Sequence, residues 1–235
     1  MKRKIGWVDG KDNIAVVRYN SNGEIVPIPG NAIASKLEIN GSLYVLSPIE
    51  GWLSVEGAKI GESLDLTNTE IGSSLYADDV KIGRCLGAED ANIGKWMTLK
   101  NAEIGGLLIL KNAKIGESLY AGDVKIGSSL YADDVKIGKS LDLRNAKIGE
   151  SLYAEDAKID GPLVLKNAEI GELITSKNTR FGEIDLRGAK IKEFEGELPE
   201  IEVSQYKIDK YTEVPESLTE QLPKYDEVYK QALRV

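Results

Sequence analysis

Aspartates recur at the last position of an 11-residue sequence repeat and are the first residues that could carry chemistry. Asp79, Asp90 and Asp134 occupy that place, and Asp78 and Asp133 lie beside two of them. Stacked carboxylates could bind a divalent cation such as Ca²⁺ or act as a glycosidase pair. Other copies of the pattern hold Asn there, which is typical of a turn residue. We therefore predict no catalytic residue, no metal ligand and no cofactor here.

Basic side chains form a second periodic set, interrupted by Glu70, Asn92, Glu103 and Glu169. The set consists of Lys59, Lys81, Lys114, Lys125, Lys136, Lys147, Lys158 and Arg180. An exposed ladder of this kind could attract an anionic polymer. It could equally be a solvated face that keeps a sheet soluble and prevents lateral aggregation, which is the interpretation we favour. Lys125, Lys136, Lys147 and Lys158 are retained as a candidate interaction surface.

Tyrosines at another fixed place, Tyr76, Tyr120, Tyr131 and Tyr153, are expected to point outward. They could form a docking surface, since Tyr is enriched in protein interfaces. The alternative is ordinary strand propensity on an exposed face. Trp96 falls at a corner of the pattern and is expected to fold over an edge.

The chain has no His and a single Cys. Ser-His-Asp and Cys-His catalysis therefore cannot operate, nor can His-based metal sites. Cys85 stands where most copies have Ser. One Cys allows no intramolecular disulfide, no signal peptide is visible, and no apolar run approaches the length of a membrane helix. We expect a non-enzymatic cytoplasmic protein without membrane association.

All these residues belong to one 11-residue unit that occurs eleven times between Ala58 and Asn178. The third position is always Ile and the fourth is Gly, except at Asp160. The seventh is Leu apart from Met97 and Ile174, and the last is Asn or Asp. A helical reading would place a Gly in almost every unit at a cost of about 1 kcal/mol each. Apolar residues also alternate, at positions 1 and 3 and at 7 and 9, which predicts strands.

We therefore predict an all-β, right-handed β-solenoid. Each unit gives two short strands, a corner at Gly with positive φ, and a corner at Asn or Asp. Two units per coil are favoured over three. The ninth positions, taken in pairs such as Leu66/Ala77 and Ala88/Leu99, always combine a large and a small side chain, which keeps the filled volume constant.

The Ala-x-Ile-Gly and Leu-x-Ala steps resemble a relaxed form of pentapeptide-repeat solenoids, and the uninterrupted rod is similar to bactofilin-type solenoids. The resemblance covers about residues 47–191 and is architectural. It implies a coil with four short sides, and no functional residue can be carried over from these families.

The ends of the chain lie outside the repeat. Residues 1–35 are predicted to be a β cap, with a hairpin of Ile14–Arg18 and Glu24–Ile28. Residues 36–191 form the solenoid and 192–235 a cap with a helical tail. Ser217 has capping-box spacing to Glu220. A helix over Pro223–Leu233 would have a thin apolar stripe with Val228 and Leu233, which predicts self-association through this end or a protein partner.

The distribution of charge along the chain limits the classes of partner that we expect. Residues 58–191 contain 18 basic and 21 acidic residues, and residues 192–235 contain 6 and 11. The acidic tail makes nucleic acid an improbable partner. The sequence thus predicts a structural or protein-interaction scaffold. The alternatives are an acidic DNA mimic that binds a nucleic-acid enzyme, or a carbohydrate- or metal-binding solenoid.

Overall fold

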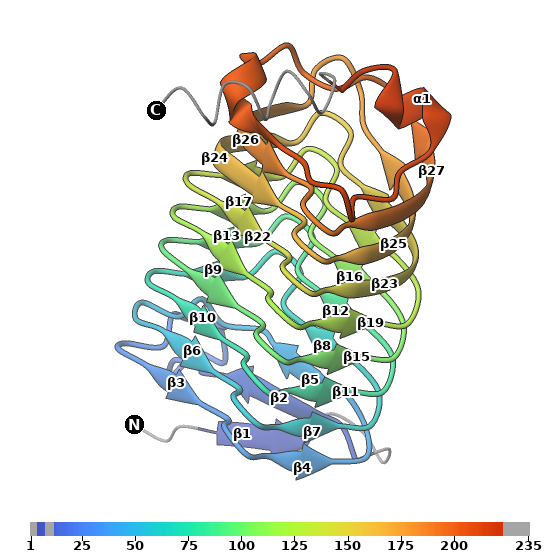
Figure 1. Cartoon of the computed structure of the whole chain (residues 1–235). Coiled ribbons are helices and arrows are strands. Elements are labelled where there is room, and N and C mark those ends of the chain that lie inside the picture. Colours follow the sequence, from blue (N-terminus) through green and yellow to red (C-terminus); the bar gives the residue numbers. More distant parts are fainter. Residues whose placement is uncertain (1–3, 8–11, 223–235) are drawn as a thin grey trace.

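The computed structural model describes residues 4–7 and 12–222 and shows a β-solenoid (Figure 1). Strands pair in parallel with strands 22 residues away. Lys59 lies beside Lys81 and Ile60 beside Ile82, for example. Each coil therefore contains two sequence units and has four short sides, as predicted.

Sides 1 and 2 belong to a 15-stranded sheet, and sides 3 and 4 to a 13-stranded sheet. Side 1 consists of β4 (Glu38–Ile39), β7 (Lys59–Ile60), β11 (Lys81–Ile82), β15 (Glu103–Ile104) and β19 (Lys125–Ile126). Side 2 consists of β5 (Leu43–Val45), β8 (Leu64–Asp65), β12 (Leu86–Gly87), β16 (Leu108–Ile109) and β20 (Leu130–Tyr131). Side 3 consists of β9 (Glu70–Ile71), β13 (Asn92–Ile93), β17 (Lys114–Ile115) and β21 (Lys136–Ile137). Side 4 consists of β3 (Ala32–Ile33), β6 (Leu53–Ser54), β10 (Leu75–Tyr76), β14 (Met97–Thr98), β18 (Leu119–Tyr120) and β22 (Leu141–Asp142).

The core is built from the apolar positions of the unit. Ile at position 3 and Leu at position 7 are buried in every regular coil, because alternate strand residues point to opposite faces. Both members of each large–small pair are also buried, on opposite sides of the same coil. Leu66 lies on side 2 and Ala77 on side 4, and the next coil reverses them with Ala88 and Leu99.

The Asn or Asp corner adopts the left-handed conformation. φ is 58° at Asn68, 56° at Asp79 and 57° at Asp90, and the same sign holds through Asn167. Asn and Asp tolerate this region better than other residues with a side chain. A backbone hydrogen bond closes the turn, for example from the Thr69 amide to the Leu66 carbonyl at 3.0 Å.

The Gly corner differs from the prediction, because the Gly residues at position 4 do not have positive φ. Their role is to allow close approach between coils. A Cβ on Gly105 would collide with the carbonyl oxygen of Gly83 in the coil beneath. The requirement for Gly is therefore steric and depends on the neighbouring coil, which a single unit does not reveal.

From residue 147 onward the strands cross the Gly corner and span two sides. They are β23 (Lys147–Tyr153), β24 (Lys158–Val164), β25 (Glu169–Ile174), β26 (Arg180–Asp185) and β27 (Lys190–Glu195). A register shift in β25 pairs Leu152 with Leu173. Leu173 is buried and Ile174 is partly exposed, so the placement of Ile174 at the inward seventh position is wrong. Where Asp160 replaces Gly, Gly161 makes the close approach, to the Lys139 carbonyl.

At the N-terminal end, β2 (Ile14–Val17) pairs with β1 (Lys4–Trp7) in an antiparallel ladder and with β5 in a parallel one. The expected hairpin forms only around its turn, where a bridge joins Tyr19 and Ile25 and backbone hydrogen bonds run from Asn20 to Glu24 and from Val26 to Arg18. The four residues of β2 are all buried, so this segment gains more by joining the stack than by pairing with Glu24–Ile28.

At the C-terminal end, the chain continues through η1 (Val203–Gln205) and β28 (Tyr206–Lys207) to the short helix α1 (Glu216–Thr219). Leu218 of α1 is fully buried and the helix packs on β27. Pro215 is the N-cap and makes no side-chain cap bond, so the capping box at Ser217 is wrong. The helix predicted over Pro223–Leu233 lies outside the described residues.

Candidate interaction surfaces

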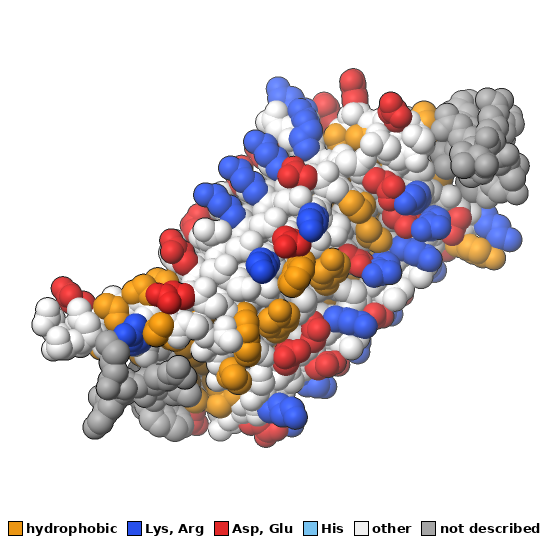
Figure 2. Space-filling view, turned by 90° about the vertical axis from the view of Figure 1, so that its left-hand side faces the viewer, with side chains coloured by type: hydrophobic (Ala, Val, Ile, Leu, Met, Phe, Trp, Pro, Cys, Tyr) orange, Lys and Arg blue, Asp and Glu red, His pale blue; other side chains and the backbone are white. Residues whose placement is uncertain are grey.

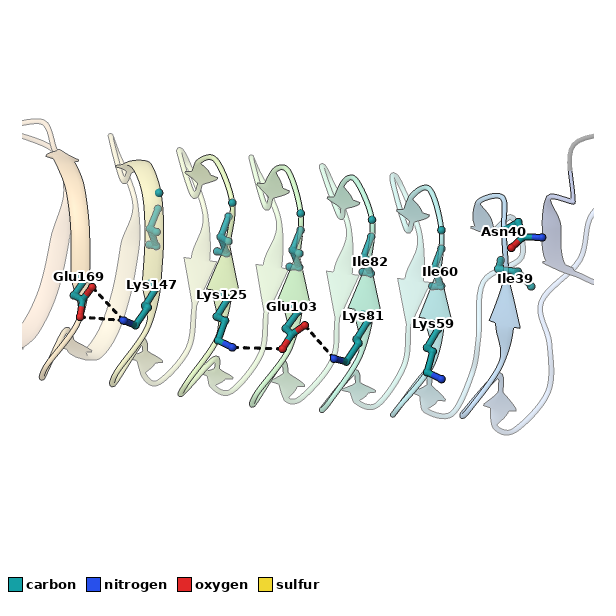
Figure 3. A pocket seen from close by; sticks show the side chains of 18 of the residues that line it. Ile39, Asn40, Lys59, Ile60, Lys81, Ile82, Glu103, Lys125, Lys147 and Glu169 are labelled. Carbon is teal, nitrogen blue, oxygen red and sulfur yellow. Dashed lines mark hydrogen bonds and ion pairs between the residues drawn. The ribbon is translucent and has the colours of Figure 1, made fainter.

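The outward residues of the side 1 strands form a column in which two lysines separate successive glutamates, and members of the column form ion pairs (Figure 3). Glu103 lies between Lys81 and Lys125, with N–O distances of 3.1 and 3.4 Å. Lys147 pairs with Glu169 at 3.2 Å. The hydrogen bond from Lys81 holds the pKa of Glu103 below its usual value. The predicted residues Lys125 and Lys147 are thus neutralised by neighbours one coil away.

A long shallow hollow, about 1270 Å³ in volume, runs along side 1 from Asn40 to Lys192. Its floor includes the corner glycines Gly61, Gly83 and Gly105, where no side chain can fit. The charged column forms one wall. The hollow is open along its length and is a furrow on the rod surface, with no enclosed site.

The outward column of side 3 carries a run of cations that form no ion pair among the described residues. Lys114, Lys136, Lys158 and Arg180 follow one another in register. Among the described residues none of the four has a carboxylate within ion-pair distance, in contrast to side 1. Figure 2 shows such a row of basic side chains along one margin of the rod. The single predicted ladder is therefore two ladders, with Lys136 and Lys158 on a different side from Lys125 and Lys147.

Several of the corner aspartates accept hydrogen bonds from the corner of the next coil. Asn101 donates from its amide to Asp79 at 3.1 Å, and Asn145 does the same to Asp123. Asp78 accepts the Lys100 backbone amide at 2.9 Å. Over residues 4–7 and 12–222, no cluster of three or more Asp, Glu or Cys is placed to hold a metal ion.

An aromatic strip lies on side 4, where Figure 2 shows orange side chains running along the rod. We define it as Trp52, Tyr76, Trp96 and Tyr120, one residue in each of four consecutive coils. The rings of Trp52 and Tyr76 meet edge to face with centroids 6.0 Å apart. Tyr120 is 41% exposed. Thr98, between Tyr76 and Tyr120 in the same column, has a buried hydroxyl without a hydrogen-bond partner.

Sequence reasoning missed Trp52 and did not connect Trp96 with the tyrosines. The signal was the spacing of 24 residues from Trp52 to Tyr76 and again from Trp96 to Tyr120. That distance is one coil plus two strand residues, so it becomes meaningful only once the coil length is known.

The other two predicted tyrosines lie on side 2. Tyr131 and Tyr153 stack with centroids 4.6 Å apart and planes 6° from parallel. Burial raises the pKa of Tyr131, and the neighbouring Tyr153 adds to the effect. Ile109 and Ile174 extend this column on either side. The four tyrosines thus do not form one surface.

The remaining candidates, Val228 and Leu233, lie outside the described residues. Within the described part of the chain, no helix combines the length and apolar character needed to cross a membrane. No protein family, curated protein or solved structure matches this chain. The likeness to pentapeptide-repeat and bactofilin-type solenoids therefore rests on architecture alone.

Proposed function

We propose that this protein is a non-catalytic scaffold that binds other protein surfaces with the flat sides of its solenoid. The observation that carries the proposal is the aromatic strip on side 4. Protein interfaces are enriched in Trp and Tyr, and these residues supply a large share of binding energy. Here four of them occupy consecutive coils of side 4, whereas the outward residues of sides 1 and 3 are largely charged.

The rod supports the strip rigidly. Leu53, Leu75 and Leu119 lie inward on the same strands and are fully buried, and each strand is hydrogen-bonded to the coils on both sides. A surface held in this way loses little conformational freedom when a partner docks, which favours binding. The same support extends to both charged ladders.

The alternatives have less support. An acidic DNA mimic needs rows of unbroken negative charge, whereas the glutamates of side 1 are outnumbered by lysines in the same column and pair with them. A cation site at the corners would compete with the amide donors that already bind Asp79 and Asp123.

Site-specific photocrosslinking tests the proposal. A photoreactive phenylalanine analogue at position 120, in the full chain expressed in its own cells, should give covalent protein adducts. The same analogue at Lys111, an exposed turn residue away from the strip, is the matched control. Equal labelling at both positions, or no protein adduct at position 120, would refute the scaffold proposal.

A further inference from the structure

The outward column of side 2 is apolar over four consecutive coils in the C-terminal half of the rod. We call these residues the side 2 strip, and they are Ile109, Tyr131, Tyr153 and Ile174. All four are partly exposed. In the same column Gly87 precedes the strip and Glu195 follows it. The apolar surface is therefore confined to this part of side 2.

The outward columns of the other three sides are different in these coils. Side 3 has Lys114, Lys136, Lys158 and Arg180. Side 1 has Lys125, Lys147, Glu169 and Lys190. Side 4 has Tyr120, Asp142, Val164 and Asp185. Among the described residues, a segment with a continuous apolar face finds a matching column at this end of the rod only on side 2.

The sequence of residues 223–235 supplies such a face. Apolar residues recur there at i, i+3, i+4, i+7 and i+8, namely Tyr225, Val228, Tyr229, Ala232 and Leu233. This spacing predicts an amphipathic helix, with Glu227 and Arg234 on its opposite face. A helix of this length is marginal on its own in water, so its apolar face needs a surface on which to pack.

The described part of the chain ends at Leu222, beside the upper end of side 2. The preceding helix α1 packs on β27 at the end of the rod (Figure 1). Gln221 donates from its side chain to the carbonyl oxygen of Gly196 at 3.1 Å. Gly196 follows Glu195, which is the neighbour of Ile174 in the outward column of side 2. Residues 223–235 therefore start next to the coil that adjoins the strip.

We propose that residues 223–235 form an amphipathic helix that docks on the side 2 strip of the same chain, running from Ile174 toward Ile109. The inference goes beyond the scaffold function and does not depend on it. With side 2 covered, the aromatic strip of side 4 is the apolar column that stays open to a partner.

The lengths of the two surfaces agree. Three coil steps of about 4.8 Å make the side 2 strip about 14 Å long. A helix rises about 12 Å from Tyr225 to Leu233. Its i, i+3 steps of about 4.5 Å are also close to the coil spacing, so successive apolar residues meet successive coils. Because the segment is tethered beside the strip, binding within one chain is favoured over binding to a second copy.

Photocrosslinking in the purified full chain tests the docking. A photoreactive phenylalanine analogue at position 153 should give an adduct with a peptide from residues 223–235, identified by mass spectrometry after digestion. The matched control is the same analogue at position 120, which replaces a Tyr on side 4 that is 41% exposed and should give no such adduct. A mixture of isotope-labelled and unlabelled chains shows whether the adduct joins parts of one chain.

Two variants of the segment, each without a change in net charge, provide the second readout at position 153. Val228→Ser/Leu233→Ser removes apolar contacts and should abolish the adduct. Glu227→Ser/Arg234→Ser alters the polar face and should retain it. Unchanged far-UV circular dichroism would show that the rod is intact in both.

The docking is overturned by the lack of an adduct at position 153, by equal adducts at positions 153 and 120, or by an adduct that survives Val228→Ser/Leu233→Ser. An adduct that joins labelled to unlabelled chains also overturns it, because a second copy is then the occupant. The scaffold proposal is separate, since it is tested by adducts with other proteins at position 120.

Discussion

At the Gly corner, the carbonyl oxygen of the coil beneath leaves no room for a side chain. Gly105→Ala should therefore lower the free energy of unfolding by about 1–3 kcal/mol, because the added methyl group collides with the backbone at Gly83. Urea denaturation followed by circular dichroism measures the change.

Gly122→Ala is the matched control. Its added Cβ meets nothing closer than 3.8 Å, and its φ is not positive. The expected change is within about 0.5 kcal/mol. If both variants lose the same stability, backbone flexibility and not steric contact governs these positions.

A second prediction at this scale concerns Asp185, which is buried and accepts hydrogen bonds from Arg187 at 2.9 and 2.6 Å. Burial alone would raise the pKa of Asp185, but the bonds from Arg187 outweigh it and the pKa is lowered. A carboxyl with a lowered folded pKa stabilises the fold above its unfolded pKa of about 3.9 and loses that contribution as pH falls.

Asp185→Asn should accordingly cost about 1–2 kcal/mol at pH 7 and progressively less below about pH 4. Denaturation midpoints of both proteins across this range provide the measurement. A stability difference that is constant from pH 7 down to about pH 2 would contradict the assignment.

At the scale of the element, α1 closes the open end of the core with one side chain. Leu218→Ala should remove roughly 2–3 kcal/mol of local stability and increase amide hydrogen exchange in β27 and β28. The central coils, which contact only their neighbours, should exchange as before. Glu216→Ala, on the exposed part of the same helix, should leave all exchange rates unchanged. Equal acceleration in every coil after Leu218→Ala would mean that the rod unfolds as one unit.

Much at this scale could be predicted from the sequence. Ile60, Leu64 and Asn68 recur with fixed spacing, and strand alternation and turn chemistry act within one unit. Two units per coil already imply that alternate units share a side, but the lysines and the tyrosines were each treated as one set, so their division between two sides was missed. Trp52 was missed because it precedes the regular copies, and the role of Gly83 depends on a neighbour 22 residues away.

At the scale of the whole molecule, coils should be removable in complete turns. Deleting residues 102–145, which make up two coils, joins Asn101 to Ala146. The segment that follows the junction then lies on side 1, as the deleted segment after Asn101 did. The shortened protein should keep its β circular dichroism and show a smaller denaturant m-value, because less surface is exposed on unfolding.

Deleting residues 102–112 alone should be more harmful. It pairs Ala121 with Ala132 across one coil, so neither ninth position fills the space that a Leu occupies in every native coil. A lower denaturation midpoint for this shorter deletion is the expected result. Greater stability than the two-coil deletion would show that volume matching across the coil is unimportant.

The register of 22 residues also affects how the chain is made. Each coil needs only the coil before it as a template, so the rod can assemble in the order of synthesis while later residues are still inside the ribosome. The sequence separation of its contacts stays short however long the rod becomes, which favours rapid folding. The stack stays open at its growing end until α1 is translated and Leu218 covers it. Nascent chains arrested after successive coils should therefore become protease-resistant from the N-terminus onward.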